Sequence, residues 1–469
     1  MNIGSRRELL IDQHLVERFS GGARLRLHRP ERREIAIVHD QPWEGAGTGY
    51  HTIFRDGDVY RMYYKSWAHT YNSKTVHPLV IAYAESRDGI QWHKPELGIV
   101  SYNGSRKNNI ILDDIHGGTA HDFSPFVDQN PACAADARYK AVGYGKPKGL
   151  YAYKSSDGIH WRIMQDAAII SKGAFDTQNI AFWDPQIRKY RAYIRDFDQK
   201  RRDIKTCVSD DFLNWSEPEW LDYPGAPSEQ LYTNQILPYY RAPHIYIGFP
   251  ARYVDRGWIE STRQLPEQEE RTERARANTR FGTAVTDTLL MTSRDGRAFH
   301  RWDEAFVRPG LRTRYNWSYG DNYLAWHVVE TKSPADDEAS ELSLYSVEGY
   351  FTGVEARLRR LALRIDGFAS AFSPLSGGEL LSKPFLYQGA SLTVNFSTSA
   401  GGELRFELQD PTGRALPGCA AGDCETMFGD ALEQRVAWKG KPDLRKWAGK
   451  PVRFRVLLKD ADLYSFRFA

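Results

Sequence analysis

The sequence SSDGIHW at residues 155–161 is one of four related segments that determine how this chain folds. The others are SRDGIQW at 86–92, SDDFLNW at 209–215 and SRDGRAF at 293–299. Each follows a short apolar or alternating run, namely LVIAYAE, GLYAYK, IKTCV or TLLMT. A strand, a tight turn and a second strand that carries an aromatic residue form a β-hairpin. We expect the Ser and Asp side chains to bond the turn backbone and the aromatic ring to pack between sheets, so the repeat is structural.

Two further strand patterns precede each turn. The inner candidates are YHTIF, DFSPFV, NIAFW, NQILPYY and NYLAWHVV, and the next are DVYRMYY, ARYKAVGY, RKYRAYI, HIYIGFP and ELSLYSV. A four-stranded unit that recurs five times predicts a five-bladed β-propeller over residues 31–352. The fifth unit lacks an Asp-Gly turn, and we expect the strand-rich segment at 24–40 to complete the ring.

The sequence pattern changes beyond residue 358, where alternating runs are separated by Gly-rich turns. This pattern predicts a C-terminal β-sandwich over residues 353–469, with residues 1–30 as an N-terminal segment. The fold class is therefore all-β. One charged segment, WIESTRQLPEQEERTERARANTRFG at 258–282, predicts a solvated helix or a mobile loop. It would be either a lid over a cleft or an oligomer contact.

The composition excludes several classes of protein. The 469 residues are 26% charged with a net charge of +3, which favours neither nucleic acid nor a membrane as partner. A homo-oligomer stays open. The start MNIGSRRELLIDQ lacks the apolar segment of a signal peptide, so we expect a cytoplasmic protein, although a chain with its secretory signal trimmed would look the same. The four cysteines form no disulfide framework, but Cys419 and Cys424 are close enough in sequence to pair.

With these repeats and a following sandwich, the chain resembles the five-bladed propeller glycoside hydrolases over nearly its whole length. This group includes invertases, levanases, arabinofuranosidases and xylosidases, and the fructan-cleaving branch carries a C-terminal sandwich. The resemblance implies a glycosidase of carbohydrate metabolism or polysaccharide degradation, with a carbohydrate substrate as its partner. The family's Asn-Asp-Pro-Asn motif is replaced here by QPWEGAGTGYHTIF, in which Glu44 is the nearest carboxylate. The Arg-Asp-Pro motif is echoed by HDFSP, which supplies Asp122, and the Glu-Cys motif is absent.

Propeller geometry gathers the residues that flank the two inner strands of each blade at one mouth of the axis. Burying so many polar groups without use would cost several kcal/mol each, so a cleft is expected there. The strand entrances supply Glu44, His51, His121, Asp122, Asp176, Gln178, Asn179, Glu229, Tyr232, Asn234 and Asp321. The strand exits supply Lys65, Trp67, Lys146, Arg195, Arg252 and Glu348.

Glycoside hydrolysis needs one protonated and one ionised carboxyl group beside the scissile bond. We expect Glu229 to be the general acid, Asp122 the base or nucleophile, and Asp176 the neighbour that tunes the acid. Glu44 is the alternative to Asp122 as the base or nucleophile. The competing interpretation is a structural set of ion pairs in which these carboxylates neutralise Arg195 and Arg252.

The other mouth residues are expected to contact substrate. This substrate-binding set is His51, Trp67, His121, Gln178, Asn179, Arg195, Tyr232, Asn234, Arg252, Asp321 and Glu348. No cofactor is expected, although His51 and His121 leave an axial calcium or other divalent ion as an alternative to hydrogen bonds with sugar hydroxyls. Arg252, Arg195 and Lys146 predict a carboxylate or sulfate on the substrate, unless they only pair with the acids.

The predicted function is an exo-acting glycoside hydrolase on a glycan or oligosaccharide, one that carries an anionic group if the cationic residues are free. A glycoside phosphorylase on the same fold would keep one acid and replace the base by cationic phosphate-binding residues. A non-catalytic carbohydrate-binding propeller would need the ring and its aromatic residues, but not the three converging carboxylates. The fold alone does not decide among the three.

Overall fold

The structure is a computed structural model that describes residues 1–68, 75–333, 336–353 and 355–469, with the backbone alone at 336–338. The chain divides into two compact units. The larger comprises residues 30–239 and 243–362, and the smaller comprises 1–29, 240–242 and 363–469. Among the described residues, no helix is long and apolar enough to cross a membrane.

Consecutive four-stranded antiparallel sheets make up the larger unit, and the described part of the chain contains five of them. The first three are β6 (Gly49–Asp56), β7 (Val59–Ser66), β8 (Val80–Ser86), β9 (Ile110–Leu112); β12 (Phe123–Val127), β13 (Tyr139–Gly145), β14 (Gly149–Ser155), β15 (Arg162–Ile163); and β16 (Ile180–Asp184), β17 (Lys189–Asp198), β18 (Arg201–Ser209), β19 (Glu219–Trp220). The last two are β21 (Leu237–Tyr239), β22 (Ala242–Gly248), β25 (Met291–Ser293), β26 (His300–Arg301); and β27 (Val329–Ser333), β28 (Asp336–Glu348), β29 (Arg357–Arg364), β5 (Glu31–Val38). A short hairpin of β10 (Asp114–Ile115) and β11 (Gly118–Thr119) lies between the first two sheets in sequence.

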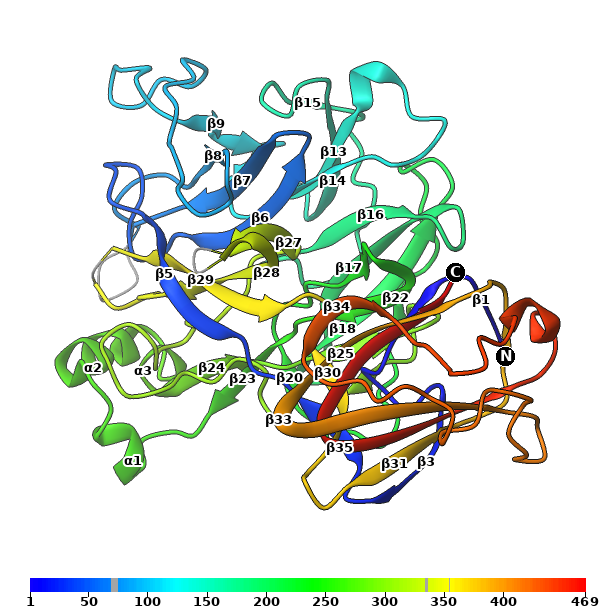
Figure 1. The fold of residues 1–469 in the computed structure, drawn as a ribbon. Coiled ribbons are helices and arrows are strands. Elements are labelled where there is room, and N and C mark those ends of the chain that lie inside the picture. The colour runs from blue at the N-terminus through cyan, green and yellow to red at the C-terminus, as the bar shows by residue number, and fades with distance from the viewer. Residues whose placement is uncertain (69–74, 334–335, 354) are drawn as a thin grey trace. The chain divides into compact units, whose positions relative to one another are not determined.

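The first strands of neighbouring sheets lie against one another around the axis. Strand β6 contacts both β12 and β27, and β12 also contacts β16. Strand β5 pairs antiparallel with β29, with Val38 opposite Arg357, so residues 31–38 of the predicted segment 24–40 complete the fifth sheet (Figure 1). The prediction is wrong for β4 (Arg24–Leu27), which pairs with β30 (Ala369–Ser373) in the smaller unit. The all-β class is confirmed, and the identification of these sheets as the complete ring stays a prediction.

The first strand of the fifth unit differs from the prediction of residues 322–329, because it begins only at Val329. Residues 322–325 do pair with β28, since the Asn322 amide donates to the Val347 carbonyl at 2.8 Å and the Ala325 amide donates to the Tyr345 carbonyl at 2.8 Å, but Trp326 bonds to the first sheet. The Trp326 amide donates to the His51 carbonyl at 2.8 Å, and the Ile53 amide donates to the Trp326 carbonyl at 3.0 Å. His327 then turns the chain with a φ of 79°. Pairing across the ring therefore interrupts the predicted strand at Trp326 and His327.

The fourth sheet continues past the breaks at 249–250 and 289–290 as a three-stranded sheet. Its strands are β20 (Gln230–Leu231), β23 (Ala251–Asp255) and β24 (Ala284–Thr288). Three helices connect β23 to β24, namely α1 (Glu260–Arg263), α2 (Gln268–Ala277) and α3 (Arg280–Thr283). The prediction of a solvated segment is wrong for Arg271 and Arg274, which are buried. Arg271 can be buried because it donates to the backbone carbonyls of Pro266 at 2.8 Å and Gly282 at 3.1 Å.

The four repeated turns share one hydrogen-bond pattern. In the turn at 155–161, Oγ of Ser155 accepts from the Gly158 amide at 2.9 Å, and Oδ1 of Asp157 accepts from the two following amides at 2.8 and 2.9 Å. The equivalent Ser and Asp side chains make the same bonds in the other three turns. Trp161 packs edge-on against Phe123 of its own sheet and Tyr63 of the neighbouring sheet. The structural interpretation of the repeat is confirmed.

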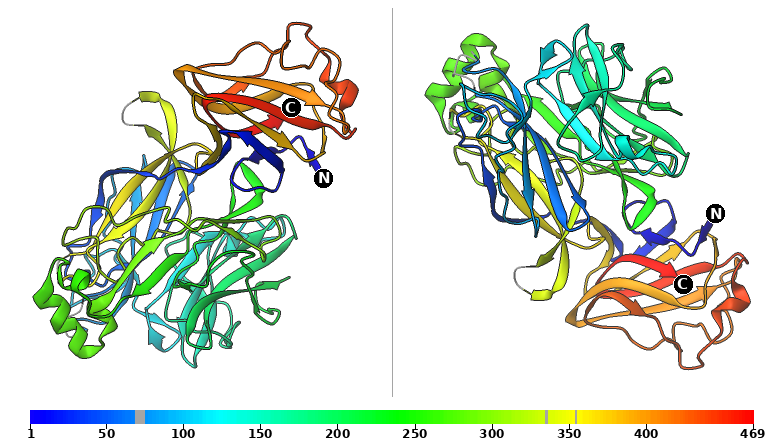
Figure 2. Two further views of the ribbon diagram at one scale, coloured as in Figure 1. Left: turned by 90° about the horizontal axis from the view of Figure 1, so that it is seen from below. Right: turned by 90° about the horizontal axis from the view of Figure 1, so that it is seen from above.

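The smaller unit combines both ends of the chain. Its strands are β1 (Asn2–Gly4), β2 (Arg7–Leu9), β3 (Val16–Gly21), β4 (Arg24–Leu27), β30 (Ala369–Ser373), β31 (Gly378–Ser382), β32 (Leu386–Tyr387), β33 (Leu392–Gln409), β34 (Asp430–Arg435) and β35 (Arg453–Phe468). Strands β2 and β3 pair with β35 and β31, so residues 1–29 are part of this unit rather than a separate segment (Figure 2). The boundary between the units also falls at 362/363 instead of 352/353.

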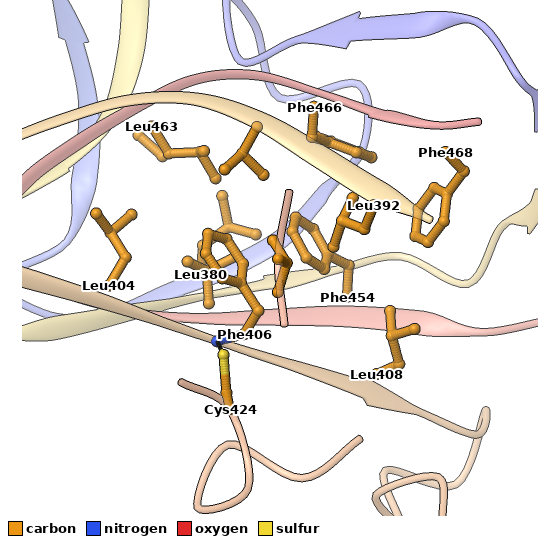
Figure 3. Packing of buried hydrophobic residues seen from close by; sticks show 14 of the residues in the cluster. Leu380, Leu392, Leu404, Phe406, Leu408, Cys424, Phe454, Leu463, Phe466 and Phe468 are labelled. Carbon is orange, nitrogen blue, oxygen red and sulfur yellow. Dashed lines mark hydrogen bonds between the residues drawn. The ribbon is translucent and has the colours of Figure 1, made fainter. Parts of the chain in front are cut away.

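The core of the smaller unit is packed between strands that pass on either side of it (Figure 3). The rings of Phe406 and Phe454 stack at 5.6 Å, and the ring of Phe466 lies 4.8 Å from that of Phe454. The thiol of Cys424 accepts from the Phe406 amide at 3.3 Å. All four cysteines are free, so Cys419 and Cys424 do not form the disulfide that their spacing allowed.

Candidate active site

Asp122 is a fully buried carboxyl group immediately before β12. Its Oδ2 accepts from Nδ2 of Asn179 at 3.3 Å. Its Oδ1 has no hydrogen-bond partner among the described residues, although Nδ1 of His121 lies 3.5 Å away. Burial raises the pKa of Asp122 well above its ordinary value, against the opposing effects of Asn179, Lys65 and Arg195. Asp122 is therefore suited to hold a proton where an exposed aspartate would not.

Lys65 is a buried amine at the end of β7, enclosed by aromatic rings. Its Nζ donates to the Tyr350 hydroxyl at 3.0 Å, and it lies 4.4 Å from the ring centroid of Tyr50 and 5.1 Å from that of Trp67. Burial lowers the pKa of Lys65 to about 7, although the charge of Asp122 acts in the opposite direction. Two neighbouring groups with opposite pKa shifts are typical of proton-transfer sites.

Arg195 connects this buried carboxyl group to an exposed one. The Arg195 amide donates to Oδ1 of Asn179 at 3.2 Å, and its Nε donates to the Ala174 carbonyl at 3.2 Å. Its Nη2 forms an ion pair with Asp176, whose side chain is 63% exposed. Asp122, Asn179, Arg195 and Asp176 thus form one continuous chain of contacts.

A tyrosine cluster lies beside these groups. We use this name for the buried side chains of Tyr50, Tyr232, Tyr319, Tyr323 and Tyr350. The Tyr319 hydroxyl donates to the Tyr232 hydroxyl at 2.6 Å, and burial raises the pKa of the other four tyrosines above its ordinary value. Burial also acts to raise the pKa of Tyr232, but Arg195, Arg202 and Arg280 lower it overall.

Gln178 and His51 hold the inner strands together across the axis. Nε2 of Gln178 donates to the His51 carbonyl at 3.2 Å and to Oγ1 of Thr52 at 3.0 Å. Its Oε1 accepts from Nε2 of Gln235 at 2.8 Å, and Nε2 of His51 lies 2.9 Å from Nε2 of His39. These bonds give both predicted substrate contacts a structural role.

Glu44 lies in an ion-paired network away from Asp122. Its Oε1 accepts from the Tyr64 hydroxyl at 2.6 Å, and its Oε2 pairs with Nζ of Lys94 at 2.6 Å. Burial acts to raise the pKa of Glu44, but His39 and Lys94 lower it to about 2. A carboxylate that is so firmly ionised and occupied fits a structural role better than a catalytic one.

The structure does not bring Glu229 to Asp122. Glu229 pairs with Arg252 at 2.8 Å and with Arg301 at 3.1 Å, while Arg252 also pairs with Asp287 at 2.6 Å. Tyr253 faces the tyrosine cluster, with its ring 6.1 Å from that of Tyr232. Because side chains alternate along a strand, the adjacent Arg252 points away from that cluster. Glu229, which pairs with Arg252, therefore lies on the same side as Arg252 and not beside the cluster.

The remaining predicted residues have local partners. Asp321 accepts from two backbone amides, each at 2.8 Å, and Glu348 pairs with Arg359 at 2.5 Å. Oδ1 of Asn234 accepts from the Ile236 amide at 3.3 Å. Trp67 is half-buried beside Lys65, and the His121 side chain, which lies next to Asp122, is 22% exposed. No group of three or more His, Cys, Asp or Glu among the described residues is arranged to hold a metal ion.

The sequence placed Lys65 at the mouth but assigned it no role, and it missed most of the tyrosine cluster. The available signal for Lys65 was a lysine that ends the run VYRMYY, where an apolar residue would continue a buried strand. The tyrosines gave no such signal, because tyrosine is common in any strand.

No family model matches the chain. An uncharacterized protein of Mycobacterium tuberculosis is 26% identical over 141 residues, a match that covers 28% of this chain and 40% of that protein. A second uncharacterized protein of the same species is 28% identical over 135 residues, with the same coverage. The chain therefore spans about two fifths of the length of the curated relatives it matches.

Among solved structures, a fructofuranosidase of Schwanniomyces occidentalis is similar at a TM-score of 0.42 and 10% identity, covering 93% of this chain and 97% of that one. The catalytic domain of an α-L-arabinofuranosidase of Coprinopsis cinerea has a TM-score of 0.44 and 8% identity, covering 72% and 97%. An N-acetylgalactosamine deacetylase of F. plautii has a TM-score of 0.43 and 11% identity, covering 72% and 95%. Identities this low do not transfer a reaction from one propeller to another.

Proposed function

We propose that the protein is a glycoside hydrolase in which Asp122 is the general acid and Asp176 the second carboxylate. The observation that carries this proposal is the buried Asp122 carboxyl group immediately before β12, whose pKa is raised by burial. A general acid must hold its proton until the glycosidic oxygen needs it. The neighbouring exposed Asp176 supplies the ionised partner that glycoside hydrolysis requires.

In this mechanism Asp122 gives its proton to the glycosidic oxygen as the bond to the anomeric carbon breaks. The carboxylate left behind is stabilised by the charges of Lys65 and Arg195, both of which favour the ionised form of Asp122. Asp176 acts on the opposite side, either on the attacking water or on the anomeric carbon itself. Asp122 is fully buried and Nδ1 of the partly exposed His121 lies 3.5 Å from its Oδ1, so we propose that the His121 ring moves before the acid reaches the substrate.

This assignment moves the acid from Glu229 to Asp122. Glu229 pairs with two guanidinium groups, and among the described residues no hydrogen bond or ion pair joins it to Asp122, Asn179 or Asp176. We also propose exo action, because Tyr50 and Tyr350 of the tyrosine cluster pack against Lys65 and close that side of the site. Only the side of His121 and Asp176 is then left for the end of a glycan chain.

A screen of aryl glycosides and oligosaccharides tests the proposal, using wild type, Asp122→Asn and the matched control Glu229→Gln. General acid catalysis contributes about 10²–10⁴-fold, so Asp122→Asn should lose that much of kcat while a folded Glu229→Gln retains most of it. Full activity of Asp122→Asn would refute the proposal. Turnover that requires inorganic phosphate would identify a phosphorylase, and the absence of turnover on every glycan would indicate a binding protein.

A further inference from the structure

Two guanidinium groups near the tyrosine cluster have no carboxylate partner among the described residues. Arg202 in β18 places its Cζ 4.4 Å from the ring centroid of Tyr253 and 5.3 Å from that of Tyr232. Arg280 at the start of α3 places its Cζ 5.3 Å from the ring centroid of Tyr319. Within the described ranges neither arginine forms an ion pair, although most charged groups around them are paired.

Buried donor atoms of both side chains lack partners. Nε of Arg202 and Nη1 of Arg280 are buried and make no hydrogen bond to any described residue. Nη1 of Arg202 donates to Oε1 of Gln230 at 2.6 Å, which fixes that side chain without neutralising it. Leaving a buried charged donor unsatisfied costs free energy, and a bound oxyanion would remove the cost.

The nearby acidic groups are already engaged. Asp176 pairs with Arg195, and Oδ1 of Asp255 accepts from Oγ1 of Thr283 at 2.6 Å. In the β17–β18 hairpin, Asp196 pairs with Lys205 at 2.8 Å. The two free guanidinium groups therefore leave an excess of positive charge beside Tyr232.

We propose that Arg202 and Arg280 form an oxyanion-binding site beside Tyr232, for a carboxylate, sulfate or phosphate group. The anion comes either from a sugar that bears it or from free inorganic phosphate. Phe197 is 41% exposed and its ring lies 5.5 Å from Cζ of Arg202, so a sugar ring can stack on it while its anionic group reaches the arginine.

This site differs from the anion-binding set expected from the sequence. The sequence predicted that Arg252, Arg195 and Lys146 would hold the anion. In the structure Arg252 pairs with Glu229 and Asp287, and Arg195 pairs with Asp176. The lowered pKa of Tyr232 supports the new location, because it reflects the same concentration of positive charge. Binding at this site needs no turnover, so it stands apart from the proposed hydrolysis.

Isothermal titration of the full chain with inorganic phosphate, glucuronate and glucose tests the site. We expect an anion to bind, with glucose as the matched neutral sugar binding more weakly than glucuronate. Charge-assisted hydrogen bonds of this kind predict that Arg202→Gln and Arg280→Gln each weaken anion binding about tenfold or more. Arg276→Gln is the control, because Arg276 lies on α2, is 70% exposed and already pairs with Glu273.

The proposal is overturned if wild type binds neither anion, or if both arginine variants bind as tightly as wild type and Arg276→Gln. Phosphate binding without glucuronate binding assigns the site to free phosphate, whereas tighter glucuronate binding assigns it to a sugar-borne anion. If the glutamine variants do not fold, Arg202→Lys and Arg280→Lys, which keep the charge, are titrated in their place and judged by the same criterion. Asp122→Asn should bind the anion like wild type, so failure of the hydrolase proposal leaves this test intact.

Discussion

At the scale of single residues, Lys65 provides the most direct check on the electrostatics of the axis. Burial lowers its pKa to about 7, so its ammonium group should titrate near neutrality. The unfolded chain holds that proton up to about pH 10.4, so the free energy of unfolding gains a contribution that rises between about pH 7 and 10. NMR titration of labelled lysines, with Lys65→Met for assignment, measures this pKa. A value near that of the exposed lysines would contradict the account.

Glu44 should show the opposite behaviour, since its pKa is lowered from 4.5 to about 2. Its pairing stabilises the fold fully above about pH 4.5, and this contribution is lost as the pH falls through 2. A shift of this size corresponds to about 3 kcal/mol. Glu44→Gln should therefore lower the free energy of unfolding at pH 7 by roughly that amount, with the difference shrinking toward pH 2. Urea denaturation across this pH range would refute the assignment if the difference were constant.

The sequence predicted part of the candidate site because blade geometry fixes where strand ends meet. Asp122, Asn179, Arg195 and Tyr232 were identified in this way, and they do lie together. It could not predict which carboxylate stays free, because ion pairing depends on residues that are distant in the chain. Glu229 was predicted from its place at a strand entrance. It pairs, however, with Arg301, which comes from a different strand 72 positions further along the chain.

At the scale of elements, the repeated turns link adjacent sheets as well as adjacent strands. The Tyr63 hydroxyl donates to the Gly158 carbonyl at 3.0 Å, and the Tyr193 hydroxyl donates to the Gly296 carbonyl at 2.8 Å. The Tyr345 hydroxyl makes the equivalent bond to the Gly89 carbonyl. The tyrosine of a middle strand thus fixes the turn of the next sheet, which explains why the motif recurs.

Gly158→Ala should destabilise this arrangement more than Gly57→Ala. Both glycines have positive φ, 79° and 62°, so an alanine costs about 1–2 kcal/mol at either position. A Cβ on Gly158 would also lie 2.8 Å from the Tyr63 hydroxyl, whereas one on Gly57 would meet nothing within 4 Å. Thermal denaturation should show the larger loss for Gly158→Ala, and equal losses would show that the sheet-to-sheet contact is unimportant.

The predicted strands fail where pairing across the ring competes with local pattern. The sequence predicted one strand over residues 322–329, and residues 322–325 do pair with β28, but Trp326 bonds to the backbone around β6 and interrupts the strand. The charged 258–282 segment looked solvated, yet backbone carbonyls satisfy Arg271 in the interior. Both errors arise because hydrogen-bond partners from other parts of the chain are invisible in a local pattern.

At the scale of the whole molecule, repetition made the architecture predictable and short strands obscured the domain limits. Recurrent turns identified the propeller, and the closing strand β5 followed from its missing partner. Strands β2 and β3 are short and their pairing partners lie more than 350 residues away, so nothing local assigned them to the sandwich.

The central claim is that Asp122 delivers a proton to the leaving oxygen at the mouth of this propeller. The ratio of wild-type to Asp122→Asn kcat, measured on matched substrates with poor and good leaving groups, tests it most directly. The account predicts a loss of about 10²–10⁴-fold for an oligosaccharide and a much smaller loss for a nitrophenyl glycoside, which needs little protonation. Equal losses on both substrates, or no loss on either, would contradict it.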